Sequence, residues 1–231
     1  MTLASLRWIV RNRAWTPWYL VRYWRFLRLR MLAPNVVTTV FVFIGRRVTI
    51  EARRGYGRIV LGRWVHLGDD NRLRCHEGTL VVGDKCVFGR DNTVNAYLDI
   101  EFGEGVLVAD WVYVCDFDHV TDDVTRPIKD QGIVKAPVRV GAGSWIGTKA
   151  SILRGTRIGA GSVIAAHAVA RGVIPDCSIV AGVPGRVVKD RRAAYVEAEQ
   201  TRIAIADIAR KTNAHVERQR SSTRASSPPN A

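Results

Sequence analysis

One of the five histidines in the sequence stands among acidic residues, where an imidazole could accept a proton. His119 occurs in the segment CDFDHVTDD and directly follows Asp118. Histidine is the usual base near neutral pH because its unperturbed pKa is about 6.5. A carboxylate such as Asp118 or Asp116 could orient the imidazole and favour its protonated form. We therefore predict that His119 is a general base and that Asp118 assists it. The remaining histidines are not expected to act in catalysis: His66, His76, His167 and His215.

The elements that must position His119 follow a six-residue repeat. Large apolar residues recur at every sixth position in one segment: Val140, Ile146, Ile152, Ile158 and Ile164. A small residue or valine stands two positions before each of them: Val138, Ser144, Ala150, Thr156 and Ser162. A period of six fits neither a helix nor an ordinary amphipathic strand. It indicates a solenoid of short strands joined by tight corners.

The same repeat is present earlier in the chain, in three runs: Leu61, Leu67 and Leu73; Val82, Phe88, Val94 and Ile100; Phe102, Val108 and Val114. Three hexads make one triangular turn, so the segment 61–169 holds roughly six turns. The phase slips after Leu73, Ile100 and Val114, and we expect an insertion to bulge from a corner at each slip. His119 falls just after the third slip, which predicts that it lies where a strand gives way to a loop.

The run VRVGAGSWIGTKASILRGTRIGAGSVIAAHAVARGVIPDCSIVAGVPGRVVKDR resembles the C-terminal half of the hexapeptide-repeat acyltransferases. The resemblance covers about residues 60–190. It implies a mainly β fold, a left-handed parallel β-helix solenoid, whose hand is an exception to the right-handed crossover rule. The segment DHVTDDVTRPIKDQGIVKAPVRVGAGSWIG is most similar to the sugar and polysaccharide O-acetyltransferases. The resemblance also implies acetyl-CoA or another acyl-CoA as co-substrate and no required metal. It further implies a homotrimer in which each site lies between neighbouring solenoids.

The resemblance assigns a further set of residues to the acceptor. An Asn at the Asn95 position, and an acid close to Asp99, contact acceptor hydroxyls in similar acetyltransferases. The insertion between Phe117 and Pro137, with Arg126 and Gln131, is expected to form a loop near the acceptor and to determine its identity. Asn and Asp are also common in turns, so turn formation is the alternative interpretation of Asn95 and Asp99.

A second set is implied to bind CoA. The resemblance places Trp145 beside the catalytic histidine and the pantetheine arm, and it places Thr148 and Ala166 along the CoA channel. Basic residues match positions near the nucleotide phosphates: Arg171, Arg186 and Lys189. The alternative is that these three are ordinary surface charges of a basic chain.

Together these residues predict a CoA-dependent O-acyltransferase. The acyl group, which we expect to be acetyl, would pass from acyl-CoA to a hydroxyl of a sugar, polysaccharide or glycolipid intermediate, by direct attack in a ternary complex. N-acylation of an amino sugar and a non-catalytic, membrane-associated solenoid scaffold are the alternatives. A γ-type carbonic anhydrase is excluded, because no histidine near residues 141–146 completes its zinc site with His119.

The first thirty residues differ in composition from the rest. They hold seven arginines and several aromatic residues, and no acidic residue precedes Glu51. Pro17 is predicted to start a helix that runs to about Leu32, before Pro34. A helical wheel groups one face as Tyr19, Leu20, Tyr23, Phe26, Leu27 and Met31, opposite Arg22, Arg25 and Arg28. This basic amphipathic helix in residues 1–32 suits peripheral contact with an anionic membrane, or packing on the open end of the solenoid or on a neighbouring subunit.

The chain-wide composition sets the remaining limits. The formal net charge of +14 favours acidic partners. No zinc-finger spacing, RNA-binding signature or helix-turn-helix is present, so nucleic acid is not an expected partner. The four cysteines form no CxxC pair and no signal peptide is recognised, which indicates a cytoplasmic protein, peripheral at the membrane if residues 1–32 bind it. We divide the chain into a helical region (1–45), the solenoid (46–190), a C-terminal helix (191–218) and a disordered tail (219–231).

Overall fold

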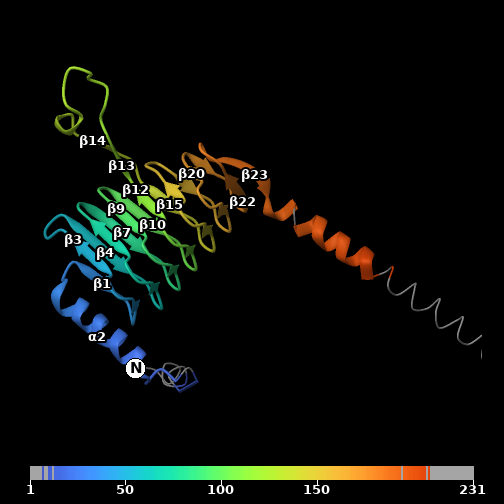
Figure 1. Ribbon diagram of the computed structural model, residues 1–231, viewed down its shortest axis with the longest axis horizontal. Coiled ribbons are helices and arrows are strands. Elements are labelled where there is room, and N and C mark those ends of the chain that lie inside the picture. Colours follow the sequence, from blue (N-terminus) through green and yellow to red (C-terminus); the bar gives the residue numbers. More distant parts are fainter. Residues whose placement is uncertain (1–6, 8–9, 12, 194, 207, 209–231) are drawn as a thin grey trace, which may run out of the picture. The chain divides into compact units, whose positions relative to one another are not determined.

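The computed structural model describes residues 7, 10–11, 13–193, 195–206 and 208. The chain divides into two compact units, Met1–Val188 and Lys189–Ala231. The first unit is a parallel β-solenoid with a helix, α2 (Pro17–Leu32), at its N-terminal end (Figure 1). In the second unit, residues 191–193, 195–206 and 208 are helical. The predicted β-helix with helices at both ends is confirmed. The predicted disordered tail (219–231) lies outside the described residues.

Three sheets form the walls of the solenoid, and the chain visits them in turn, with parallel pairing between turns, up to the last two strands of the second sheet. The first sheet contains β1 (Val36–Thr38), β4 (Gly57–Leu61), β7 (Gly78–Val82), β10 (Asp99–Phe102), β15 (Val138–Val140), β18 (Arg157–Ile158) and β21 (Val173–Ile174). The second contains β2 (Phe43–Ile44), β5 (His66–Leu67), β8 (Val87–Phe88), β11 (Leu107–Val108), β16 (Trp145–Ile146), β19 (Val163–Ile164), β22 (Ser178–Ala181) and β23 (Arg186–Asp190). The third contains β3 (Thr49–Ala52), β6 (Arg72–Cys75), β9 (Thr93–Ala96), β12 (Tyr113–Cys115), β17 (Ser151–Ile152) and β20 (Val169–Ala170). The solenoid therefore starts at Val36, within the segment that the sequence assigned to the N-terminal region.

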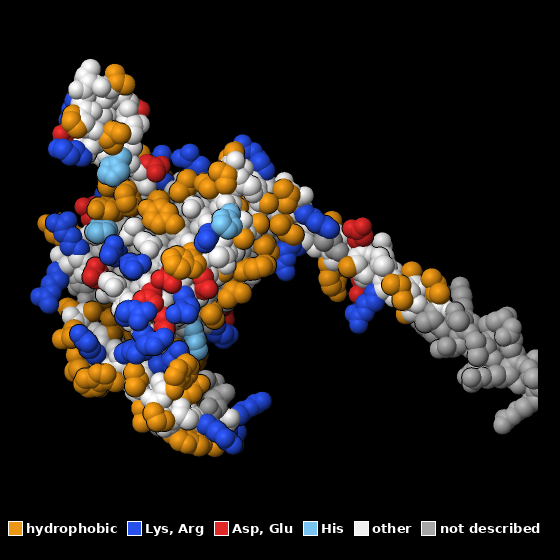
Figure 2. All heavy atoms as spheres, in the orientation of Figure 1, with side chains coloured by type: hydrophobic (Ala, Val, Ile, Leu, Met, Phe, Trp, Pro, Cys, Tyr) orange, Lys and Arg blue, Asp and Glu red, His pale blue; other side chains and the backbone are white. Residues whose placement is uncertain are grey.

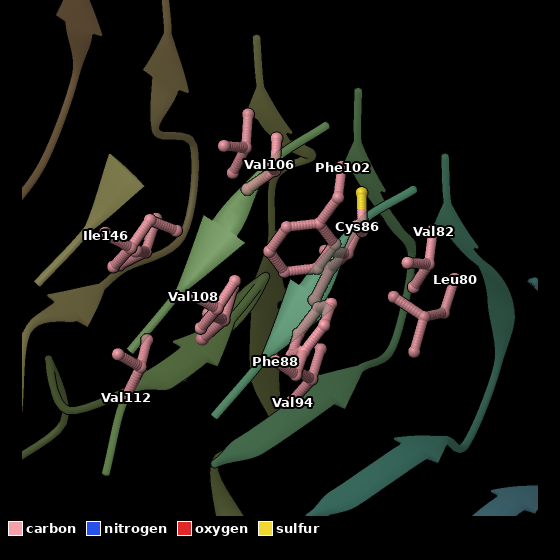
Figure 3. Packing of buried hydrophobic residues seen from close by; sticks show 14 of the residues in the cluster. Leu80, Val82, Cys86, Phe88, Val94, Phe102, Val106, Val108, Val112 and Ile146 are labelled. Atoms are coloured by element: carbon pink, nitrogen blue, oxygen red, sulfur yellow. The ribbon is translucent and has the colours of Figure 1, made fainter. Parts of the chain in front are cut away.

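The six-residue repeat marks the inward-facing side chains. Val140, Ile146 and Ile152 are each at most 3% exposed, and the small partners Ser144 and Ala150 are equally buried. Figure 3 shows inward side chains of successive turns in the core, among them Val108 and Ile146. Phe88 and Phe102 pack there edge to face. Burial of this core supplies the main stabilisation of the fold, about 25 cal/mol for each square ångström of apolar surface removed from water.

Only one of the three phase slips produces a bulge. At the first slip, Leu73 and Cys75 both face inward from β6, and Leu80 and Val82 do the same from β7. Longer strands thus absorb the extra residues, because side chains two apart in a strand share a face. Ile100 and Phe102 on β10 explain the second slip in the same way. The expectation of three corner insertions is therefore wrong for two of them, and only the slip after Val114 sends the chain out of the solenoid.

Helix α2 covers the N-terminal end of the solenoid. Tyr23 and Phe26 place their ring centroids 4.7 and 5.1 Å from that of Phe41, and Arg25 donates from Nη1 to the Ile44 carbonyl oxygen at 3.3 Å. The predicted packing on the open end of the solenoid is confirmed. Within the described residues, no helix has both the length and the apolar character needed to cross a bilayer.

The apolar face predicted for α2 from the helical wheel contacts the solenoid only in part. Tyr19, Tyr23 and Phe26 face the solenoid as predicted, and Leu29 joins them. Three other residues that were assigned to the same face are exposed on the far side of the helix: Leu20, Leu27 and Met31. The assigned face was too wide, because the apolar residues of α2 surround the helix and do not form a single stripe.

His66 predicts how acid affects stability at this end of the solenoid. Its ring stacks on Phe43 at 3.9 Å, and burial, followed by the charge of Arg22, lowers its pKa to about 4. The unfolded chain, with a His66 pKa near 6.5, binds more protons between these two values. The free energy of unfolding is therefore highest above pH 6.5 and falls as the pH is lowered to 4, by about 1–2 kcal/mol because solvent screens the partly exposed ring.

His66→Phe should keep the stacking and remove this pH dependence. Chemical unfolding from pH 7 to pH 4 should show the variant gaining stability relative to the wild type as the pH falls. His167→Asn, which removes an exposed histidine, is the matched control and should follow the wild type. Parallel pH profiles for the wild type and His66→Phe would contradict the assignment.

Candidate active site

The insertion after Val114 forms an antiparallel hairpin at the corner between the third and first sheets. Its strands are β13 (Phe117–His119) and β14 (Ile133–Lys135), with Asp118 opposite Val134 and His119 opposite Ile133. A short 3-10 helix, η1 (Ile128–Asp130), lies in the connecting loop. Figure 1 shows the hairpin projecting from the stacked turns. His119 therefore lies on an ordered strand at the base of the projection.

Asp116 anchors the hairpin to the solenoid. Its carboxylate is fully buried and accepts hydrogen bonds from the backbone N–H groups of three consecutive residues at 2.7–2.8 Å: Tyr97, Leu98 and Asp99. Its own carbonyl oxygen accepts from the Ala136 N–H at 2.9 Å, where the chain returns to the solenoid. The interpretation of Asp116 as an orienting group for His119 is wrong, because its carboxylate is occupied by the corner one turn earlier.

A series of neighbouring rings, one pair stacked and two pairs in edge contact, leads to His119. The rings of His76 and Tyr97 lie 4.5 Å apart, those of Tyr97 and Phe117 lie 4.6 Å apart, and Phe117 meets His119 at 6.3 Å. Successive turns place these rings at the same corner. His119 is the last ring of the series, and its side chain is exposed. Its imidazole is thus held in place and open to a ligand.

Asp118 lies against two arginines of later turns. Its carboxylate accepts a hydrogen bond from Arg154 Nε at 3.1 Å and lies 3.6 Å from Arg171 Nη2. Together with His119, Val134 and Arg154, it lines an open cavity of about 620 Å³. Asp118 and His119 therefore share a cavity, while the direct partners of the Asp118 carboxylate are arginines. Its action on the imidazole stays a prediction.

A cluster of polar side chains lies on the third sheet beside the hairpin. Asn95 is paired with Cys115 on β12, and its Oδ1 atom is buried without a hydrogen-bond donor in the described part of the chain. Tyr113 lies on the same strand, and burial raises the pKa of both Tyr113 and Cys115. The unpaired Asn95 oxygen is suited to accept a hydrogen bond from a ligand hydroxyl.

The other predicted acceptor residues have partners of their own. The Asp99 carboxylate pairs with Arg139 on the first sheet. Gln131 donates from Nε2 to the carbonyl oxygens of Asp123 and Arg126, and Arg126 donates to the Asp130 carbonyl oxygen. Arg126 and Gln131 thus hold the loop of the hairpin in shape, and the structure does not bring them to His119.

The predicted CoA residues lie on another face of the same chain. Trp145, 47% exposed, stands on the second sheet between Leu107 and Val163, and Thr148 and Ala166 occupy the corner that follows this sheet. His119 instead projects from the corner between the third and first sheets. One chain alone therefore does not unite Trp145 with His119.

The three basic residues predicted to bind the CoA phosphates do not lie together with Trp145. Arg171 lies at the corner beside Asp118, and Arg186 is exposed and donates to the Gly185 carbonyl oxygen. Lys189 belongs to the second unit and is not placed relative to this site. The described residues include no group of three or more His, Cys, Asp or Glu side chains arranged to hold a metal ion.

Two site residues escaped the sequence analysis. Arg154 follows the inward-facing Ile152 by two positions, at the corner one turn after the hairpin. The six-residue repeat places Arg154 at the same corner as the insertion, so its position in the repeat could have identified it as a site residue. Tyr113 gave a weaker signal, since any outward position of the solenoid can carry an aromatic residue.

Comparisons with known proteins agree with this architecture. A family model described as bacterial transferase hexapeptide (six repeats) matches residues 137–172. The chain is 55% identical to Rv3034c of Mycobacterium tuberculosis, named as an acetyltransferase, over 215 residues that cover 91% of this chain and 72% of the relative. It is 31% identical to WbbJ of Escherichia coli, named as a lipopolysaccharide biosynthesis O-acetyl transferase, over 46% of this chain and 62% of that protein.

A solved structure shows the same fold. The N-acyltransferase AntD from Bacillus cereus, in complex with dTDP and 3-hydroxybutyryl-CoA, superposes with a TM-score of 0.62 at 20% identity, covering 78% of this chain and 96% of AntD. The length and identity of the match to Rv3034c, together with the repeat, identify the family. The chain belongs to the hexapeptide-repeat transferases and is an acyltransferase of that family.

The two aspartates that flank Phe117 should behave differently when neutralised. Asp116→Asn replaces a buried carboxylate that accepts from three backbone N–H groups, and it should lower the free energy of unfolding by about 2 kcal/mol. Asp118→Asn alters only a half-exposed ion pair and should change it by no more than about 0.5 kcal/mol. Denaturant titration of both variants checks this. Equal destabilisation by the two substitutions would contradict the anchoring role of Asp116.

Proposed function

We propose that the protein transfers an acyl group, acetyl in the simplest case, from acyl-CoA to a hydroxyl of a sugar, polysaccharide or glycolipid, with His119 as general base. The observation that carries the proposal is the placement of His119: a ring supported by Phe117, exposed, and opening on a cavity that Arg154 also lines. A base must reach the proton of its substrate, and His119 lies on the hairpin and lines a cavity.

The reaction requires one proton carrier and no covalent enzyme intermediate. Neutral His119 accepts the proton of the acceptor hydroxyl as its oxygen attacks the thioester carbonyl carbon. The new C–O bond forms, the C–S bond breaks, and the sulfur leaves with the proton that the imidazolium returns. The Asn95 oxygen, buried without a donor in the described residues, would accept a hydrogen bond from an acceptor hydroxyl.

The choice of hydroxyl over amine as acceptor is supported by WbbJ, whose name describes an O-acetyl transferase of lipopolysaccharide biosynthesis. AntD is an N-acyltransferase, but at 20% identity it supports only the fold. The CoA part of the proposal is supported by the acetyltransferase relative and by the basic side chains Arg171 and Arg186 near the end of the solenoid. Hydroxylamine, which cleaves esters and leaves amides intact, distinguishes O-acylated from N-acylated products.

The proposal also requires a second copy of the chain. Trp145 lies on the second sheet and Thr148 at the corner that follows it. His119 projects from a different corner of the solenoid. In a cyclic homotrimer, the second sheet of one copy can face the hairpin of the next, so each cleft would contain His119 of one copy and Trp145 of its neighbour. We therefore propose a homotrimer with three shared sites.

Loss of the imidazole should abolish most of the transfer. His119→Ala should lower the rate of CoA release in the presence of acceptor by about 10²–10⁴-fold, because general-base catalysis contributes this much. Acetyl-CoA and a panel of cell-envelope glycans, with mass spectrometry of the products, provide the assay. His66→Phe, a substitution near the N-terminal end of the solenoid, serves as the control and should retain wild-type activity. Wild-type activity in His119→Ala would refute the role of His119.

Mixed trimers test the shared site. His119→Ala and Trp145→Ala homotrimers should both be weakly active. When the two variants are unfolded and refolded together in equal amounts, about a quarter of the clefts should combine an intact His119 with an intact neighbouring Trp145 and regain activity. If native mass spectrometry demonstrates mixed trimers but no activity is recovered, the shared site is contradicted, and both residues of a site would come from the same copy.

A further inference from the structure

Helix α2 has two apolar faces, and the solenoid uses only one of them. Tyr19, Tyr23 and Phe26, spaced at i, i+4 and i+7, pack toward Phe41 and Phe43. The opposite face repeats the spacing at i, i+4, i+7 and i+11, and its side chains are 50–60% exposed: Leu20, Trp24, Leu27 and Met31. These four large apolar side chains lie on successive turns of one helix face. Together they form a contiguous apolar surface whose exposure to water is unfavourable.

The charges that the helix itself carries are all of one sign. Residues 1–50 contain no Asp or Glu, and α2 itself carries Arg22, Arg25, Arg28 and Arg30. Arg22 lies over the ring of Trp18 at 3.6 Å, which keeps a cation beside an exposed indole. Figure 2 shows hydrophobic side chains gathered over α2 with Lys and Arg side chains among them. A partner for this face must therefore be apolar in one part and negatively charged in another.

A cavity next to the helix has the same character. It measures about 420 Å³, and its lining combines apolar side chains with Arg25, Arg28 and Arg47. Arg25 donates to the Ile44 carbonyl oxygen and Arg47 pairs with Asp70. Arg28 makes no ion pair or hydrogen bond within the described residues, so its charge is available to an anion from outside.

We propose that the outer face of α2 binds the surface of an anionic membrane. Leu20, Trp24, Leu27 and Met31 enter the boundary between headgroups and acyl chains, and Arg28 meets lipid phosphates beside them. A second copy of the chain is disfavoured as the occupant, because its own α2 brings arginines and no compensating acid. Such a placement holds the solenoid, capped by the inner face of the helix, next to lipid-linked material.

Vesicle flotation of the full-length protein tests the proposal. The wild type should float with phosphatidylglycerol vesicles and bind pure phosphatidylcholine vesicles at least about tenfold more weakly. The combined substitution Trp24→Gln, Leu27→Gln and Met31→Gln should lower binding to phosphatidylglycerol by about tenfold or more. Arg28→Gln should lower it by about fivefold, the effect of one basic residue near the surface, without affecting phosphatidylcholine.

A matched variant controls for loss of exposed apolar area in general. Tyr195→Gln, Ile203→Gln and Ile205→Gln remove three equally exposed side chains from the second unit and should leave flotation unchanged. Circular dichroism and native mass spectrometry confirm that each variant keeps its fold and oligomeric state. Absence of wild-type flotation, equal binding to neutral vesicles, or a smaller oligomer in the α2 variant would each overturn the proposal, the last in favour of a second copy of the chain.

Discussion

The register between successive turns is the constraint on which the rest of the structure depends. Parallel strands pair residue for residue, so each side chain lies directly above its equivalent one turn away, as Leu107 lies between Val87 and Trp145. An inward position must then be apolar, or polar and hydrogen-bonded to a neighbouring turn as Ser144 is. Extra residues must either lengthen a strand or leave at a corner. The residues of the hairpin that carries His119 leave the solenoid at a corner. At this corner, side chains from earlier and later turns can contact the hairpin.

The site follows from this stacking. Turns before the hairpin supply the Tyr97 ring and the backbone N–H groups that Asp116 accepts from, while turns after it supply Arg154 and Arg171, which meet Asp118. The same stacking keeps Trp145 on its own sheet, away from the corner of the hairpin. A shared site between copies is therefore the arrangement in which a triangular solenoid can combine residues from two of its faces.

Much of the fold could be predicted from the sequence because the inward pattern is strict. Val140, Ile146 and their equivalents are buried as the six-residue repeat requires, and Pro17 begins the N-terminal helix as predicted. The contacts of outward residues could not be predicted, because the repeat fixes where a side chain stands and leaves its partner open. Asp116 and Asp118 look alike in sequence, yet one binds backbone N–H groups and the other binds arginines. The two apolar faces of α2 were likewise merged into one, since spacing alone does not say which face meets the solenoid.

We propose that His119 of one copy faces an acyl-CoA thioester held against the neighbouring copy. A crystal structure of the protein with bound CoA measures this directly. We expect a cyclic trimer in which the CoA sulfur lies in the cleft between two solenoids, beside the neighbouring copy's Trp145 and close to the His119 imidazole. A CoA sulfur bound away from His119, or a cleft whose lining comes from a single copy, would contradict it.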